Sequence, residues 1–145
     1  MYIRALEFAN DKHKGQKRAN GESYIVHPIE VSLKFLPRTN WQTKIVAVLH
    51  DVLEDTNTSY EELDNNFGID ITIPVFILSK PHDISYEKYI EGIKEYENPV
   101  VTAVKIADLK HNLSTIDNIP DLDKRKRLKE RYERALAVLE ENENI

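Results

Sequence analysis

The sequence predicts an all-α protein that folds as one compact domain. The chain has 145 residues, which is the length of one ordinary domain with its own core. It contains only four glycines, and no segment alternates polar and β-branched residues in the way that strands do. Apolar residues instead recur at the three- and four-residue spacing of amphipathic helices almost throughout. We therefore expect a single helical domain over residues 1–145.

The first two helices are predicted from apolar spacing and from turn residues. The first is marked by the spacing of Ile3, Leu6, Ala9 and His13, and it ends near Gly15. Residues 18–24 form a loop, because Asn20-Gly21 is a turn-forming pair. Pro28 suits the first position of a second helix, whose apolar residues continue to Phe35. This start places His27 at the N-terminal edge of that helix.

Cap residues predict the remaining helices. Asn40 is expected to cap a third helix, and Ser59 with Glu62 forms a capping-box pattern before a helix that stops at Gly68. Residues 71–78 are apolar, β-branched and interrupted by a proline, so that periodicity does not separate helix from strand, and the helical neighbourhood favours helix. Three further helices begin at Ser85, at Asn98-Pro99 and at Asp121, and the last runs to about Glu140.

Composition excludes several classes of protein. Without cysteine, the chain has no disulfide, zinc ribbon or thiol chemistry, so any metal must be held by histidine, carboxylate and water. The net charge of −5 argues against a nucleic-acid-coating protein, although local basic clusters leave a small anionic ligand possible. The N-terminus has no apolar signal segment, and no long apolar run follows. We expect a cytoplasmic protein without a membrane partner; the sequence does not determine its oligomeric state.

One predicted helix carries an unusual group of polar residues. Its apolar residues run from Ile45 to Leu53, and they are interrupted and followed by His50, Asp51, Glu54 and Asp55. The four-residue spacings place these side chains on one side of the helix. Three carboxylates on a core-facing surface would repel one another and lose hydration unless a cation compensated them. A divalent metal accounts for the group; the alternative is a solvated acidic helix end with ordinary caps.

Two distant residues extend this ligand set. Asp108 lies among the apolar residues of a later helix, where an aspartate is rare unless it is paired. His27 supplies a second imidazole. Two histidines and two aspartates suit manganese, iron or another first-row divalent ion better than calcium. Coordination positions would remain for water and substrate.

The order of four segments resembles the hydrolase domain of the RelA/SpoT-type alarmone enzymes. The segments are residues 15–18, 21–28, 50–56 and 105–112, and they span nearly the whole chain. Because the alarmone-synthesising part of the long members has no room here, the resemblance is to the small, hydrolase-only form. It implies an HD-type helical bundle that acts as a guanosine-3′,5′-bis(diphosphate) 3′-pyrophosphohydrolase, degrading ppGpp to GDP and pyrophosphate in the cytoplasm.

The resemblance also implies roles for individual residues. One divalent ion, expected to be Mn²⁺, would be held by His27, His50, Asp51 and Asp108. Glu54 and Asp55 correspond to the catalytic acidic pair, and a carboxylate there can orient a water molecule and take its proton. Arg18 matches an arginine that packs on the guanine base. Other positions at or near the nucleotide pocket are Tyr24, Lys80, Asn112 and Thr115.

Three departures from the family pattern keep other functions open. Leu109, Ser114 and Ala19 stand where cationic residues are common in the family, and a highly phosphorylated substrate needs cationic partners. The alternatives are an HD-type phosphatase of another nucleotide and a non-catalytic nucleotide-sensing protein. Among the other histidines, we expect His13 to buttress the 15–24 loop and His111 to orient Asp108 or Asn112.

Overall fold

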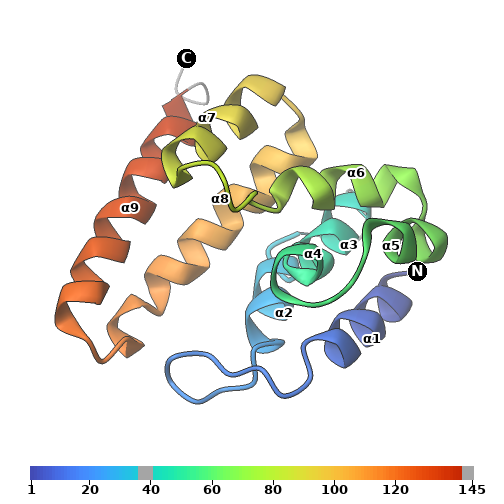
Figure 1. The fold of residues 1–145 in the computed structure, drawn as a ribbon, viewed down its shortest axis with the longest axis horizontal. Coiled ribbons are helices and arrows are strands. Elements are labelled where there is room, and N and C mark those ends of the chain that lie inside the picture. Colours follow the sequence, from blue (N-terminus) through green and yellow to red (C-terminus); the bar gives the residue numbers. More distant parts are fainter. Residues whose placement is uncertain (36–40, 142–145) are drawn as a thin grey trace.

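The computed structural model describes residues 1–35 and 41–141, and this part of the chain is helical without a β-strand (Figure 1). The α-helices are α1 (Tyr2–Lys12), α2 (Val26–Ser32), α3 (Trp41–Leu49), α4 (Val52–Asp55), α5 (Tyr60–Phe67), α6 (Ile69–Leu78), α7 (Tyr86–Tyr96), α8 (Pro99–Ser114) and α9 (Leu122–Glu140), with a short 3₁₀ helix η1 (Ile116–Asn118). The all-α prediction is confirmed. Within these residues, no helix is both long enough and apolar enough to cross a membrane.

Two central helices, α3 and α8, position the site. Every residue of α3 from Thr43 to Leu49 is buried, and this helix packs against α1, α2, α6 and α8. Helix α8 in turn packs against α2, α6 and α9, and Figure 1 shows α9 lying along it. The polar residues that α2, α3 and α8 carry are therefore brought toward a common interior, although they are far apart in the sequence.

Most predicted helix boundaries are confirmed by cap hydrogen bonds. The side chains of Ser59, Ser85, Asn98 and Asp121 each accept a hydrogen bond from a backbone amide two or three residues later. Gly68 ends α5 at a φ of 83°, a conformation that favours glycine. Residues 71–78 are helical as predicted, with the proline inside α6. The predicted Asn40 cap lies outside the described residues.

The second helix differs from its prediction at both ends. Helix α2 begins at Val26, two residues before Pro28, and ends at Ser32, so Phe35 lies beyond it. His27 nevertheless lies in the first turn, as predicted, and its side chain is buried. A proline is accepted at this third position because amides in the first turn of a helix have no helical acceptor.

The prediction of one continuous helix through residues 50–55 is wrong. Helix α3 ends at Leu49 and α4 begins at Val52, so His50 and Asp51 lie at the junction between them. In a continuous helix the Ala47 carbonyl would accept from the amide of residue 51. Here it receives the His50 amide at 3.4 Å and the His50 ring Nδ1 at 2.6 Å. The apolar pattern continues on both sides of the junction, which is why spacing alone did not reveal it.

Candidate metal centre

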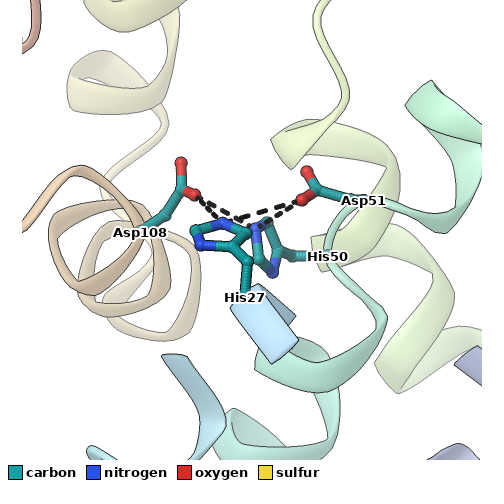
Figure 2. A group of neighbouring side chains, drawn as sticks. All are labelled: His27, His50, Asp51 and Asp108. Atoms are coloured by element: carbon teal, nitrogen blue, oxygen red, sulfur yellow. Dashed lines mark hydrogen bonds and ion pairs between the residues drawn. The ribbon is translucent and has the colours of Figure 1, made fainter. Parts of the chain in front are cut away.

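Two imidazoles and two carboxylates meet where α2, the α3–α4 junction and α8 come together (Figure 2). His27 comes from α2, His50 and Asp51 from the junction, and Asp108 from α8. One ligand atom from each residue lies within 4.8 Å of the other three. The structure thus brings together all four residues that the sequence analysis selected as metal ligands.

The four side chains face one another through defined atoms. Asp108 Oδ1 lies 2.7 Å from His27 Nε2 and 3.2 Å from His50 Nε2. On the other side, Asp51 Oδ2 lies 3.1 Å from His50 Nε2 and 3.8 Å from His27 Nε2. Figure 2 shows the two carboxylates flanking the imidazole rings. Two nitrogen and two oxygen donors at this spacing fit a divalent first-row ion.

Contacts behind each imidazole turn its Nε2 toward the centre. A carbonyl only accepts hydrogen bonds, so His50 Nδ1 donates to the Ala47 carbonyl at 2.6 Å, and Nε2 is the ring nitrogen that faces the centre. His27 Nδ1 lies 2.7 Å from His111 Nδ1. Burial, with the nearby charges of His27 and Arg18, lowers the pKa of His111 to about 4. A neutral His111 can therefore accept a hydrogen bond from the Nδ1–H of His27.

His111 therefore differs from its predicted role. We expected it to orient Asp108 or Asn112, but its ring packs on His27, with ring centroids 4.8 Å apart. Asn112 itself reaches Asp108, from Nδ2 to Oδ1 at 3.4 Å. The orienting contact predicted for His111 is thus made to an imidazole rather than to a carboxylate.

Lys105 is a buried cation that the sequence analysis missed. Its Nζ lies 2.8 Å from Asp108 Oδ2, and the rings of Tyr86 and Tyr89 lie beside the ammonium. Burial alone would raise the pKa of the Asp108 carboxyl, but Lys105 and the two imidazoles outweigh it and hold that pKa well below its usual range. Because Lys105 occupies Oδ2, Asp108 presents Oδ1 to the centre. A lysine three residues before an aspartate in an apolar helix was the available signal.

The acidic pair lies beside the four-residue centre, on α4. Glu54 Oε1 accepts the Lys80 backbone amide at 2.6 Å, and Asp55 Oδ2 accepts the Tyr24 hydroxyl at 3.2 Å. Partial removal from water, together with the negative charges of Asp51 and Glu54, raises the pKa of Asp55 to about 7. Desolvation also raises the pKa of Glu54, although the Lys80 amide opposes it. Both side chains are exposed at the edge of the centre, where they can meet water.

Tyr24 joins the ligand set to the acidic pair. Its hydroxyl donates to Asp51 Oδ2 at 2.7 Å and to Asp55 Oδ2 at 3.2 Å, so the two carboxylates share the hydroxyl proton of Tyr24. The His13 ring packs on Tyr24, and Gln16 links His13 Nδ1 to the Asp55 carbonyl. The 15–24 loop is thus held against the centre, which is the buttressing contact expected of His13.

The predicted nucleotide-pocket residues lie in three places. Arg18 Nη2 donates to Asn112 Oδ1 at 3.3 Å and to Thr115 Oγ1 at 3.0 Å, and these three residues line a cavity of about 110 Å³. Tyr24 and Lys80 do not line it. Tyr24 lies at the centre itself, and Lys80 lines a different cavity of about 610 Å³ beside Glu54.

Comparison with known proteins identifies the family. The family model of the HD domain matches residues 5–139. The chain belongs to the HD domain family. The His50-Asp51 doublet lies in the centre of this HD domain, next to the His27 and Asp108 side chains.

Curated relatives of this HD domain are long enzymes of alarmone metabolism. It is 39% identical over 122 residues to the guanosine-3′,5′-bis(diphosphate) 3′-pyrophosphohydrolase of Aquifex aeolicus, covering 78% of this chain and 17% of that protein. The protein of the same name from Borreliella burgdorferi is 37% identical, with 81% and 19% covered. The bifunctional (p)ppGpp synthase/hydrolase SpoT of Escherichia coli is 32% identical, with 83% and 18% covered. The chain thus spans less than a fifth of these relatives.

A solved structure shares the fold of this HD domain. It belongs to a metazoan ortholog of SpoT that is described as hydrolysing ppGpp. The two superpose with a TM-score of 0.83 at 23% identity, covering 95% of this chain and 84% of that one. This likeness confirms the predicted HD-type helical bundle.

Proposed function

We propose that this HD domain, formed by the whole of residues 1–145, is a metal-dependent phosphohydrolase that converts ppGpp to GDP and pyrophosphate. The observation that carries the proposal is the buried centre of two imidazoles and two carboxylates with the acidic pair at its edge. The names of relatives at 37–39% identity support the same reaction. The test is release of pyrophosphate from ppGpp by the purified protein with added Mn²⁺ and its loss with a chelator.

The four ligands would hold one divalent ion, and Mn²⁺ fits a set of imidazole nitrogens and carboxylate oxygens without thiolate. When bound, such an ion lowers the pKa of a water molecule and offsets the negative charge of a phosphoryl group. His27 and His50 contribute Nε2, because their Nδ1 atoms face His111 and the Ala47 carbonyl. Asp108 contributes Oδ1, because Lys105 holds its other oxygen.

The acidic pair would handle the proton of the attacking water. A carboxyl whose pKa is about 7, as at Asp55, can accept a proton near neutral pH better than an ordinary carboxylate can. Glu54 is fixed by the Lys80 amide, so it can orient the water for attack on the 3′ phosphorus. The new bond joins the water oxygen to phosphorus, and the bond from phosphorus to the ribose 3′ oxygen breaks. That ribose oxygen leaves with a proton, giving GDP and pyrophosphate.

Arg18→Lys should raise KM for the guanosine substrate by roughly tenfold to a hundredfold, with a smaller effect on kcat. Stacking of a base on a planar side chain contributes about 1–3 kcal/mol, and lysine keeps the charge without the plane. Asn112 and Thr115 already hold the guanidinium in position. Steady-state kinetics with guanosine and adenosine 3′-diphosphates checks this, and equal hydrolysis of both by the wild-type protein would contradict guanine recognition.

A second candidate substrate is a nucleotide with fewer phosphates. The absence of cationic residues at Leu109, Ser114 and Ala19 favours it. Leu109 is fully buried in the core, and the Ser114 hydroxyl donates to the His111 carbonyl. The neighbouring Lys110 lies 3.4 Å from Glu140, so its charge is already partnered. A metal-supplemented panel of 3′-phosphorylated nucleotides distinguishes the two substrates. Binding of these nucleotides without release of phosphate or pyrophosphate would instead indicate the nucleotide-sensing alternative.

Mn²⁺ affinity should increase from pH 6 to pH 8 by about tenfold per pH unit for each proton displaced. Burial disfavours a charged His50, but Asp51 and Asp108 outweigh it and raise its pKa well above the usual value. His50 therefore keeps at neutral pH a proton that the ion must replace. A raised histidine pKa stabilises the metal-free fold below pH 6.5, and this stabilisation is lost as pH rises through the folded-state value.

Titration calorimetry in two buffers of different ionisation enthalpy counts the released protons. The Asp55→Asn variant is the control, because Asp55 also titrates near pH 7 and is not one of the four ligands. If the dependence of Mn²⁺ affinity on pH persists in Asp55→Asn, the displaced proton belongs to the ligand set. An affinity that does not change with pH in the wild-type protein would show that no ligand proton is displaced.

A further inference from the structure

A large cavity lies beside Glu54, apart from the smaller cavity that Arg18, Asn112 and Thr115 line. Its volume is about 610 Å³, within the range of roughly 300–1,000 Å³ that is typical of small-molecule sites. It is formed by α4, the start of α5, the end of α6 and α7. Its lining is mainly apolar and rich in rings: Leu53, Tyr60, Phe76, Tyr89, Ile93 and Tyr96. The smaller cavity at Arg18 shares no lining residue with it.

The ring-lined walls suit a planar ligand. Tyr60 and Phe76 pack edge to face, with ring centroids 5.6 Å apart and an interplanar angle of 86°. Both side chains line the cavity and are substantially exposed, at 40% and 56%. Aromatic side chains at such sites bind flat rings by offset or edge-to-face packing.

The charged side chains of the cavity favour an anion. Lys80 and Lys88 line it, and Glu54 is the acidic residue in the lining. Lys80 Nζ donates to the Pro81 carbonyl, a neutral acceptor, so its charge is not neutralised by that contact. Glu54 is turned toward the Lys80 backbone amide. A phosphate group near the two lysines would therefore meet positive charge.

Gly92 lies in the wall of this cavity. The other three glycines have φ values between 83° and 88°, so the backbone requires them. Gly92 instead lies inside α7, where glycine is among the least favourable residues. A Cβ atom built there would meet nothing within 4 Å, so close packing does not require glycine either. A larger side chain at position 92 would reduce the free volume of the cavity, which Gly92 lines.

We propose that this cavity is a second ligand site, and that it binds a planar aromatic ring carrying a phosphate group. The ring would lie between Tyr60, Phe76 and Tyr96, with the phosphate toward Lys80 and Lys88. Glu54 lines the cavity and belongs to the acidic pair, so the bound ligand adjoins the centre. The site does not depend on the proposed ppGpp hydrolysis, because its residues form the cavity without the four metal ligands.

The test measures binding of 1-naphthyl phosphate, a fluorescent planar phosphate, to the purified protein in the presence of a chelator. Without added metal, turnover does not interfere with the binding curve. Gly92→Phe fills the cavity and should weaken binding by about tenfold or more, whereas Gly92→Ala should change it by less than about threefold. Lys88→Gln should weaken binding several-fold and reduce its dependence on salt.

Controls locate the bound probe. Arg18→Lys alters the smaller cavity and should leave binding unchanged, and circular dichroism checks that each variant keeps its helices. If Gly92→Phe does not fold, Gly92→Leu replaces it as the cavity-filling variant. Wild-type affinity in a folded cavity-filling variant, or loss of binding in Arg18→Lys, would overturn the proposal. Hydrolysis of ppGpp by the wild-type protein with Mn²⁺ is measured separately, so either proposal can fail without the other.

Discussion

Replacing Glu54 by glutamine should lower kcat for ppGpp by about 10²–10⁴-fold while the protein still binds its metal ion. Glutamine has nearly the same shape and still accepts the Lys80 amide, so the side chain keeps its position. It loses the negative charge that orients the attacking water. Glu54 is not among the four residues whose ligand atoms cluster, so metal binding should remain within about threefold of wild type.

His50→Ala is the matched comparison, because it removes a ligand and leaves the acidic pair in place. This variant should lose metal binding in titration calorimetry and lose activity as a consequence. Measuring both quantities for both variants separates the two roles. Retention of the ion by His50→Ala together with its loss from Glu54→Gln would show that the roles are reversed.

Lys105→Met should reduce the free energy of unfolding of the metal-free protein by about 3–5 kcal/mol, the usual cost of removing one partner of a buried ion pair. Asp108 is 5% exposed and would lose the ammonium 2.8 Å from its Oδ2. Methionine keeps the contact with the rings of Tyr86 and Tyr89, so the loss is mainly electrostatic. Urea denaturation at pH 7 in a chelator measures it.

Lys110→Met is the control on the same helix. Lys110 is 60% exposed and pairs with Glu140 at 3.4 Å, so its removal should cost about 0–1 kcal/mol. Lys105→Gln is a second variant that retains a hydrogen-bond donor and should recover part of the stability. Equal stability of Lys105→Met and Lys110→Met would mean that the buried ammonium does not stabilise Asp108.

The sequence predicted the parts of this fold that depend on local chemistry. Ser85, Asn98 and Asp121 cap the helices that they were expected to begin, because an N-cap side chain acts on amides two or three residues away. The candidate ligands could also be selected from the sequence, since an aspartate such as Asp108 in an apolar helix requires a compensating partner.

The parts that were missed depend on packing between distant segments. The break at residues 50–51 arises because one ring nitrogen takes a backbone carbonyl, which apolar spacing does not report. The contact between His27 and His111 joins α2 to α8, and the contact of Tyr24 with Asp51 joins a loop to the centre. Spacing along the chain specifies the face of a helix, but the residue that meets that face is determined by tertiary structure.

Lys105 also determines the charge that the centre presents to a substrate. Neutral imidazoles with the carboxylates of Asp51 and Asp108 would be neutralised by a divalent ion. The ammonium held 2.8 Å from Asp108 adds one positive charge to that set, at a buried position where water screens it weakly. A phosphate group at the centre would therefore be attracted by a field as well as by direct coordination. If the proposed function holds, helix α8 would contribute to substrate attraction through Lys105, which is buried behind Asp108.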